Sequence, residues 1–247
     1  PESAVDIFNH IASSTPTTSQ WEVGGHIFGK YASQTAAADA RAILPLPSVL
    51  AIVDTALSRR WNVWIDAQIP QPHGVHVGAR PASQSLHIAH ALHLVIERGL
   101  DADNGTAVAQ SDVRSYFDVL HVLRIAEWMV EKGGSPSDVA SLVRFQMMPT
   151  VRLHVAEGVS VMIQNRSKGG LTGTRTARVM TRIPVEATAA LLYDQLRPCG
   201  LPVVNGGTLP LATYVDNVSV VAPTQEMAIL ALEVIEDELV NQWGIQV

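Results

Sequence analysis

Apolar residues recur at helical spacing in several segments of the chain, and turn residues mark the ends of these segments. In the clearest case Leu86, Leu92 and Val95 fall on one helix face, with Ser83 predicted as the N-cap and Gly99 as the end. The predicted helices cover 48–60, 83–98, 119–131, a stretch starting at Ser135-Pro136, a stretch after the glycine-rich loop 169–173, and 224–244, capped by Thr224.

Strand patterns are shorter than the helical ones. Residues 106–112 form an apolar run that predicts a buried strand ending at Asp112. Residues 151–164 alternate around a turn and predict a β-hairpin. Residues 211–222 predict two more short strands, with Asp216-Asn217 at the tight turn between them.

The remaining segments carry little periodicity. Residues 1–40 are predicted to be irregular or only partly helical, and 69–82, with several Pro and Gly, to be a loop. Helices and short strands mixed in this order predict an α+β fold with a small, mainly antiparallel sheet backed by helices.

Composition narrows the class of protein. A chain of 247 residues with 47% hydrophobic and 16% charged residues can bury a sizeable core and is not expected to be disordered. Cys199 is the single cysteine, which excludes a disulfide framework and a cysteine zinc site. The apolar runs are too short for a transmembrane helix, so no membrane partner is expected.

Net charge argues against a nucleic-acid partner, whereas the distribution of bases argues for one. The chain has 23 acidic and 17 basic residues, a net charge of −6. Between Arg144 and Arg182, however, seven bases accompany one acid, Glu157. Most of the bases are Arg, which suits bidentate phosphate contacts. On charge alone this stretch is either a solvated face or a phosphate-binding surface.

Two carboxylates stand out by position. Asp112 ends a predicted strand and Asp216 lies in a predicted hairpin turn. If the two strands are neighbours, both carboxylates emerge at one edge of the sheet, where they suit Mg²⁺. Two such ions can support an in-line phosphoryl displacement. The alternative for each residue is that it only caps a turn.

Three strings around these residues resemble the motifs of reverse transcriptases. Asp112-Val113-Arg114-Ser115-Tyr116-Phe117-Asp118 resembles the first catalytic motif, in which an aromatic residue follows the Asp by five positions. Tyr214-Val215-Asp216-Asn217 resembles the aromatic-x-Asp-Asp hairpin. Arg166-Ser167-Lys168-Gly169-Gly170-Leu171-Thr172-Gly173 resembles the loop that supports template and incoming nucleotide.

Upstream strings resemble the fingers of the non-LTR retroelement and group II intron type. They are Gly78-Ala79-Arg80-Pro81 with Ser83 and Ser85, and Leu46-Pro47-Ser48-Val49-Leu50 with the helix ending Arg59-Arg60-Trp61. The resemblance implies a right-hand polymerase: an N-terminal extension (1–42), fingers (43–105) and a palm (106–247), with hairpin 151–164 at the border and the chain ending before the thumb.

The resemblance also implies roles for individual residues. Asp112 and Asp216 would hold Mg²⁺ or Mn²⁺, with the backbone carbonyl of Val113 completing one coordination sphere. Phe117 would be the steric gate that excludes a ribose 2′-hydroxyl. The nucleotide-binding residues would be Arg80, which would contact triphosphate or template phosphate, and Lys168 and Gly169 in the loop. Tyr214 and Asn217 would complete the hairpin.

Two departures from the family pattern keep alternatives open. The second Asp of the hairpin is Asn217, which removes a charge from the metal site, and the usual Gln before the loop glycine is Lys168. The first hypothesis is an intracellular RNA-directed DNA polymerase core from a retrotransposon, with an RNA template, a DNA or RNA primer and dNTPs as partners. The second is a decayed, nucleic-acid-binding relative. A third, an RNA-templated RNA polymerase, is disfavoured by Phe117.

Other candidate residues carry less chemistry. His87, His90 and His93 recur at i, i+3 and i+6, but the outer two diverge by roughly 120° around a helix, so a helix-face role is favoured over zinc binding. Asp118 is expected to be a structural hydrogen-bonding residue. The chain contains neither a Gly-x-Ser-x-Gly elbow nor a phosphate-binding Gly-x-x-x-x-Gly-Lys loop.

Overall fold

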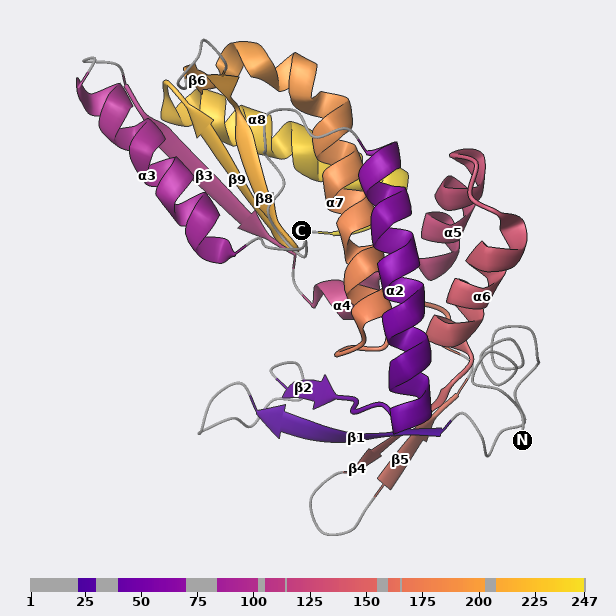
Figure 1. Ribbon diagram of the computed structural model, residues 1–247. Coiled ribbons are helices and arrows are strands. Elements are labelled where there is room, and N and C mark those ends of the chain that lie inside the picture. The colour runs from indigo at the N-terminus through magenta and orange to yellow at the C-terminus, as the bar shows by residue number, and fades with distance from the viewer. Residues whose placement is uncertain are drawn as a thin grey trace. The chain divides into compact units, whose positions relative to one another are not determined.

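Contacts between residues group the chain into two compact units, each built from two separate stretches. The first unit comprises Pro1–Trp61 and Phe117–Arg178, and the second comprises Asn62–Tyr116 and Val179–Val247. The chain passes from one unit to the other at three points, and each point falls inside a helix: α2 (Ser48–Gln68), α4 (Tyr116–Val119) and α7 (Arg175–Leu196). The computed structural model (Figure 1) describes residues 22–29, 40–69, 84–101, 105–113, 115–154, 160–164, 166–202 and 208–246.

A four-stranded mixed sheet belongs to the first unit, in the order β2-β1-β4-β5. β1 and β4 run parallel, with Val23 opposite Val151, and both of these side chains are buried in the core. The antiparallel pairing of β4 with β5 confirms the predicted hairpin over 151–164. The strands are β1 (Glu22–Gly29), β2 (Ala40–Ile43), β4 (Thr150–His154) and β5 (Ser160–Ile163).

Strand β1 corrects the prediction that residues 1–40 are irregular or only partly helical, and its parallel pairing makes this sheet mixed. The strand contains Gly24 and Gly25, which weaken a strand pattern, and it forms between β2 and β4, which pair with both of its edges. A Cβ at Gly25 would lie 2.3 Å from Leu44 Cδ2 and 3.0 Å from Leu153 Cδ2. Close packing therefore requires glycine at position 25. The same glycine lowers the strand propensity of the sequence, which is why the pattern does not predict β1.

Two helices, α5 (Val122–Glu131) and α6 (Pro136–Met147), form a helical hairpin in the first unit, with Gly133-Gly134 between them. The predicted helix 119–131 is split, because α4 ends at Val119 and α5 begins after His121. The carbonyls of Phe117 and Leu120 accept hydrogen bonds from the glycine-rich loop rather than only from their own helix. This tertiary contact explains a break that periodicity does not predict.

A three-stranded antiparallel sheet, in the order β3-β9-β8, is the centre of the second unit. Every residue of β9 from Val218 to Ala222 is buried, so both faces of this central strand are covered. Helix α8 packs against β3 and β9, and α3 packs against β8. The strands are β3 (Ala107–Asp112), β6 (Leu201–Pro202), β7 (Thr208–Leu209), β8 (Leu211–Tyr214) and β9 (Asn217–Ala222); the helices are α3 (Ser85–Asp101) and α8 (Gln225–Glu238).

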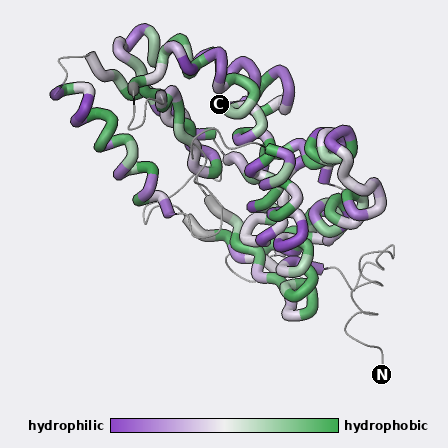
Figure 2. Tube along the Cα trace, turned by 45° about the horizontal axis from the view of Figure 1, so that its top comes forward, coloured by the Kyte–Doolittle hydropathy of each residue, from purple (hydrophilic) through white to green (hydrophobic). Residues whose placement is uncertain are grey.

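Most predicted elements of the second unit are confirmed. The strands over 106–112 and 211–222 form, and the Thr224 hydroxyl caps α8 by accepting from Met227 N at 3.2 Å. The prediction that the first of these strands is buried is wrong, because the residues of β3 alternate between half-buried and exposed at the side of its three-stranded sheet. The prediction that Gly99 ends its helix is wrong, because α3 continues to Asp101 with Gly99 buried. Hydrophobic and hydrophilic residues alternate along the helices (Figure 2), and none of the described helices combines the length and apolarity that crossing a bilayer requires.

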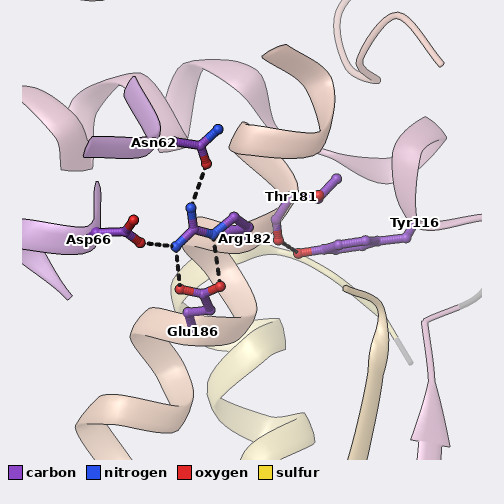
Figure 3. A network of polar contacts seen from close by, with 6 residues as sticks. All are labelled: Asn62, Asp66, Tyr116, Thr181, Arg182 and Glu186. Atoms are coloured by element: carbon purple, nitrogen blue, oxygen red, sulfur yellow. Dashed lines mark hydrogen bonds and ion pairs between the residues drawn. The ribbon is translucent and has the colours of Figure 1, made fainter. Parts of the chain in front are cut away.

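A buried arginine organises the polar interior of the second unit (Figure 3). Arg182 is 1% exposed and pairs with Glu186 one turn away at 2.9 Å, while its other nitrogens donate to Asn62 and Asp66 of α2. Burial lowers the pKa of Arg182, but hydrogen bonds and charges from Glu186 and Asp66 raise it above its ordinary value. The guanidinium therefore stays charged and holds the two helices together within this unit.

Tyr116 makes a second polar link to α7 in the same unit (Figure 3). Its hydroxyl donates to the carbonyl of Thr181 at 2.6 Å and accepts from the backbone of Val185. Thr181 and Val185 are i, i+4 partners beside Pro184, whose ring removes the neighbouring helix bond. The hydroxyl thus bridges a weakened turn, and burial with the charges of Asp216 and Glu186 raises the pKa of Tyr116 well above its usual range.

Replacing Arg182 with Met is expected to destabilise the protein by about 3–5 kcal/mol, because Glu186 is then left buried without its cation. Urea unfolding monitored by circular dichroism measures this loss. Arg197→Met, at an exposed position just after α7, is the matched control and is expected to change the unfolding free energy by less than about 0.5 kcal/mol. Equal midpoints for the two variants would contradict the role assigned to Arg182.

Candidate active site

The pairing of β3 with β9 brings the two predicted acidic positions to one edge of the second unit's sheet. Asp112, the last residue of β3, lies opposite Asn217, the first residue of β9, and Asp216 directly precedes Asn217. The backbone N–H of Val113 donates to the carbonyl of Asp216 at 3.1 Å, which ties the two strand ends together. The expectation that these two strands are neighbours is confirmed.

The hairpin turn consists of Val215 and Asp216, one residue earlier than the predicted Asp216-Asn217, because Tyr214 pairs with Asn217. Val215 has a φ of 56°, a left-handed conformation that is costly for a β-branched residue. Hairpins with a two-residue turn require this conformation at the first turn position and normally place glycine there. The strain is therefore concentrated beside Asp216, as is common at functional sites.

One face of this sheet edge is polar and open. Asp112 is exposed, and strand alternation places Tyr214, Asn217 and Asp112 in one row across the three strands. In the next row Gln110 Nε2 donates to Ser219 Oγ at 3.0 Å, and Ser219 Oγ donates to Asn217 Oδ1 at 3.3 Å. The opposite face is closed by α8, where Ser111 Oγ donates to Glu236 at 2.7 Å.

Two Asp carboxylates and the amide oxygen of Asn217 are oxygen ligands at this edge, while the predicted role of the Val113 carbonyl stays a prediction. This set suits a hard cation such as Mg²⁺, which is usually bound by one or two carboxylates together with substrate phosphates. Among the described residues, no group of three or more His, Cys, Asp or Glu side chains is placed to hold a metal ion. Asn217 places a neutral amide beside the two aspartates, at the position where the motif it resembles has a carboxylate.

The predicted nucleotide loop belongs to the first unit, where it packs on the backbone of α4. Gly169 N–H donates to the carbonyl of Leu120 and Gly170 N–H to that of Phe117, both at 2.8 Å. Gly169 has a φ of 87°, and a Cβ there would lie 3.1 Å from the carbonyl oxygen of Asp118. The close approach of the chain's own backbone therefore already requires this glycine. Phe117 is half-buried and Lys168 is exposed.

A buried polar network behind this loop was not predicted from the sequence. Gln146 is 0% exposed and contacts Leu171, Thr174 and Thr176, and Asp54 of α2 accepts hydrogen bonds at the start of α7. The only available signal is that each is a polar residue inside an apolar run, Phe145-Gln146-Met147 and Ile52-Val53-Asp54. Such positions are rarely fully buried unless they are hydrogen-bonded.

Three cationic side chains, Arg124, Arg166 and Lys168, lie in or beside the loop. Burial lowers the pKa of His121, and the nearby charges of Arg124 and Lys168 lower it further. Burial also lowers the pKa of Arg166, whose guanidinium donates to the carbonyl of Gln146 at the end of α6. This end of the loop is therefore a cationic patch made of Lys168, Arg124 and Arg166.

The other candidate residues are accounted for separately. Arg80 lies outside the described residues, so its predicted phosphate contact stays a prediction. His87, His90 and His93 are exposed on α3, where His93 Nε2 lies 3.1 Å from Glu97 and His87 Nδ1 accepts from Gln84 N at 3.3 Å.

The sequence matches no family model and no curated protein. The structure, by contrast, is similar to solved structures of telomerase, a reverse transcriptase. It matches apo telomerase from Candida tropicalis, truncated from the C-terminal domain, with a TM-score of 0.57, 11% identity and coverage of 91% of this chain and 47% of that chain. It matches telomerase from Candida albicans, in complex with a TWJ fragment of telomeric RNA, with a TM-score of 0.61, 12% identity and coverage of 94% and 43%.

These similarities show the fold: the chain has a reverse-transcriptase-like α+β fold and spans less than half the length of either telomerase chain. The prediction of an α+β fold that resembles reverse transcriptases is therefore confirmed for the fold. The narrower assignment to the non-LTR retroelement and group II intron type stays a prediction.

Replacing Lys168 with Met is expected to raise the pKa of His121 toward its ordinary value, because one of the two neighbouring positive charges is removed. The pKa is measured by NMR titration, with His121→Gln used to assign the signal. Lys132→Met is the matched control, since Lys132 caps the opposite end of α5 and its removal should leave the titration unchanged. An unchanged His121 in the Lys168 variant would contradict the placement of this loop.

Proposed function

We propose that this chain is the catalytic core of an RNA-directed DNA polymerase. It would join the 3′-oxygen of a primer to the α-phosphorus of a dNTP on an RNA template, breaking the bond from that phosphorus to the bridging oxygen and releasing pyrophosphate. The observation that carries the proposal is the register of β3 and β9, which sets Asp112 beside Asp216 inside a reverse-transcriptase-like fold. The RNA bound in the Candida albicans structure supports a nucleic-acid partner.

Asp112, Asp216 and the carbonyl of Val113 would hold Mg²⁺ or Mn²⁺, which stabilises charge on the attacking and leaving oxygens when bound. The pairing of Tyr214 with Asn217 and the hydrogen bond from Val113 hold the backbone at Asp216, which would limit reordering during the reaction. Palm and fingers in this proposal are the segments 106–247 and 43–105.

The remaining roles concern the nucleotide. Phe117 would place an aromatic face against C2′ of the sugar and leave no room for a 2′-hydroxyl, which selects dNTPs. Lys168 and Gly169 would contact the nucleotide from the loop, and Arg80 would contact phosphate. The cationic patch at Lys168, Arg124 and Arg166 supports this assignment, since a net charge of −6 would otherwise repel a polyanion.

Primer extension on an RNA template with dNTPs and Mg²⁺ tests the proposal. Asp112→Asn and Asp216→Asn are each expected to lower the rate by at least about 100-fold, because each removes a carboxylate from the reacting centre while keeping its shape. Asp237→Asn, on an exposed position of α8, is the matched control and should retain the wild-type rate. An Asp112→Asn variant as active as wild type would sink the proposal.

A second candidate function is nucleic-acid binding without polymerisation, and the amide at Asn217 is the observation that favours it. Asn217 contributes no negative charge, and its oxygen already accepts a hydrogen bond from Ser219. For an active polymerase we expect Asn217→Asp to lower the Mg²⁺ concentration needed for half-maximal extension. A silent wild type that gains incorporation in this variant would instead identify a decayed site.

The same assay, run with NTPs in place of dNTPs, separates the DNA polymerase from an RNA-templated RNA polymerase. A preference for NTPs in the wild type would replace the first proposal by the latter.

A further inference from the structure

The glycine-rich loop of the first unit is held from two sides by hydrogen bonds to consecutive peptide groups. On one side the Phe117 carbonyl accepts from Gly170 N–H at 2.8 Å. On the other side Gln146 Oε1 accepts from Leu171 N–H at 2.8 Å. Because a backbone N–H can only donate, this contact also fixes which way the Gln146 amide points. The loop is therefore clamped between the side chain of α6 and the backbone of α4.

The rest of the Gln146 amide is anchored to the start of α7. Its Nε2 donates to Thr174 Oγ1 at 3.1 Å and to Thr176 Oγ1 at 2.6 Å. The Thr176 hydroxyl in turn donates a hydrogen bond to Asp54 Oδ1 at 2.6 Å. The Gln146 amide therefore pairs with the Leu171 N–H and with the hydroxyls of Thr174 and Thr176, and all of these groups belong to the first unit.

Asp54 fixes the far end of this chain. Its carboxylate, 3% exposed, accepts from the backbone N–H groups of Arg175 at 2.7 Å and Thr176 at 2.9 Å. These are first-turn N–H groups of α7, which have no partner inside the helix, and the positive end of the helix dipole favours a carboxylate there. Asp54 therefore holds the start of α7 and the Thr176 hydroxyl in place. Gln146 connects this hydroxyl to the loop through its own hydrogen bonds.

Phe117 depends on this clamp because α4 is only four residues long. A helix of one turn is not stable by itself, so its backbone takes the conformation that outside contacts impose. The hydrogen bond from Gly170 fixes the peptide group that follows Phe117, and backbone conformation in turn restricts the rotamers available to the ring. A Cβ at Gly170 would lie 3.3 Å from Gln146 Oε1, so the loop has little room to shift.

We propose that Gln146 is a positioning residue for sugar selection: by clamping the glycine-rich loop to the carbonyl of Phe117, it fixes the orientation of the ring that rejects a ribose. The inference rests on the proposed function for the identity of the selected sugar. The mechanical part, that Gln146 sets the orientation of Phe117, stands on the hydrogen bonds alone.

The first test compares dNTP and NTP incorporation efficiencies, as kcat/KM, for Gln146→Met and wild type. Met keeps the length of the side chain and removes the acceptor and both donated bonds. We expect the preference for dNTPs to fall by about 10- to 100-fold, the range that a small misplacement near a reacting group produces. Val139→Ala, at a position of the same helix that is 3% exposed, is the control for lost stability and should keep the wild-type preference.

Two further variants tie the effect to Phe117. If Gln146 acts through this ring, Gln146→Met added to Phe117→Val should lower the preference no further than Phe117→Val alone, because the two changes remove one interaction. Thr176→Val removes one hydrogen bond to Gln146 with little change in volume, and it should also lower the preference for dNTPs. This variant takes the place of Gln146→Met if the latter fails to fold. Additive losses in the double variant would overturn the inference.

A readout without catalysis separates failure of this inference from failure of the proposed function. The chain has four phenylalanines, so ¹⁹F NMR of protein labelled with fluorophenylalanine gives few signals, and Phe117→Leu assigns the one of interest. We expect the Phe117 signal to shift or broaden in Gln146→Met and not in Val139→Ala. An unchanged signal overturns the inference, whereas an inactive wild type with a shifted signal overturns only the polymerase assignment.

Discussion

The antiparallel pairing of β3 with β9 is the constraint on which the candidate site depends. β9 is the central strand of its sheet and is buried along Val218–Ala222, so its register cannot slip without exposing apolar side chains. That register alone decides that Asp112 ends opposite Asn217. The Val113 to Asp216 hydrogen bond then ties the two strand ends together, and the tight turn that carries Asp216 strains the backbone at Val215. Asp112 and Asp216 are 104 positions apart in the sequence, and they come to the same sheet edge because hydrophobic burial fixes the strands beside them.

Buried polar groups play the corresponding role elsewhere in each unit. In the second unit Arg182 is surrounded by Glu186, Asp66 and Asn62, and in the first unit Asp54 and Gln146 close the start of α7. Each network is costly if one member is removed, since the others remain buried. Polar satisfaction of this kind specifies a single arrangement of the elements, which apolar packing alone would leave less sharply defined.

The comparison with telomerase illustrates how little sequence a fold requires. At 11% and 12% identity most side chains differ, yet the two structures align with 91% and 94% of this chain at TM-scores of 0.57 and 0.61.

What the sequence by itself determined are the features set by local periodicity and local chemistry. The existence of helices α2, α3 and α8, of the hairpins over 151–164 and 211–222, and of the strand ending at Asp112 follows from patterns within a few residues of each other. The ends do not: α2 continues to Gln68, beyond the predicted end at residue 60, and α3 continues to Asp101. Asp112, Phe117 and Asp216 are visible as candidates because their neighbours form recognisable strings, although their roles stay predictions.

Only the tertiary structure decided the features that depend on partners distant in the chain. β1 exists because β2 and β4 supply its hydrogen bonds, and the break between α4 and α5 exists because the glycine-rich loop takes up two carbonyls. Gln146 and Asp54 have no signature of their own, since a buried polar residue is defined by the donors and acceptors that surround it. Periodicity records which face of an element is buried; it carries no information on which buried groups meet, and that is why the polar networks could be found only in three dimensions.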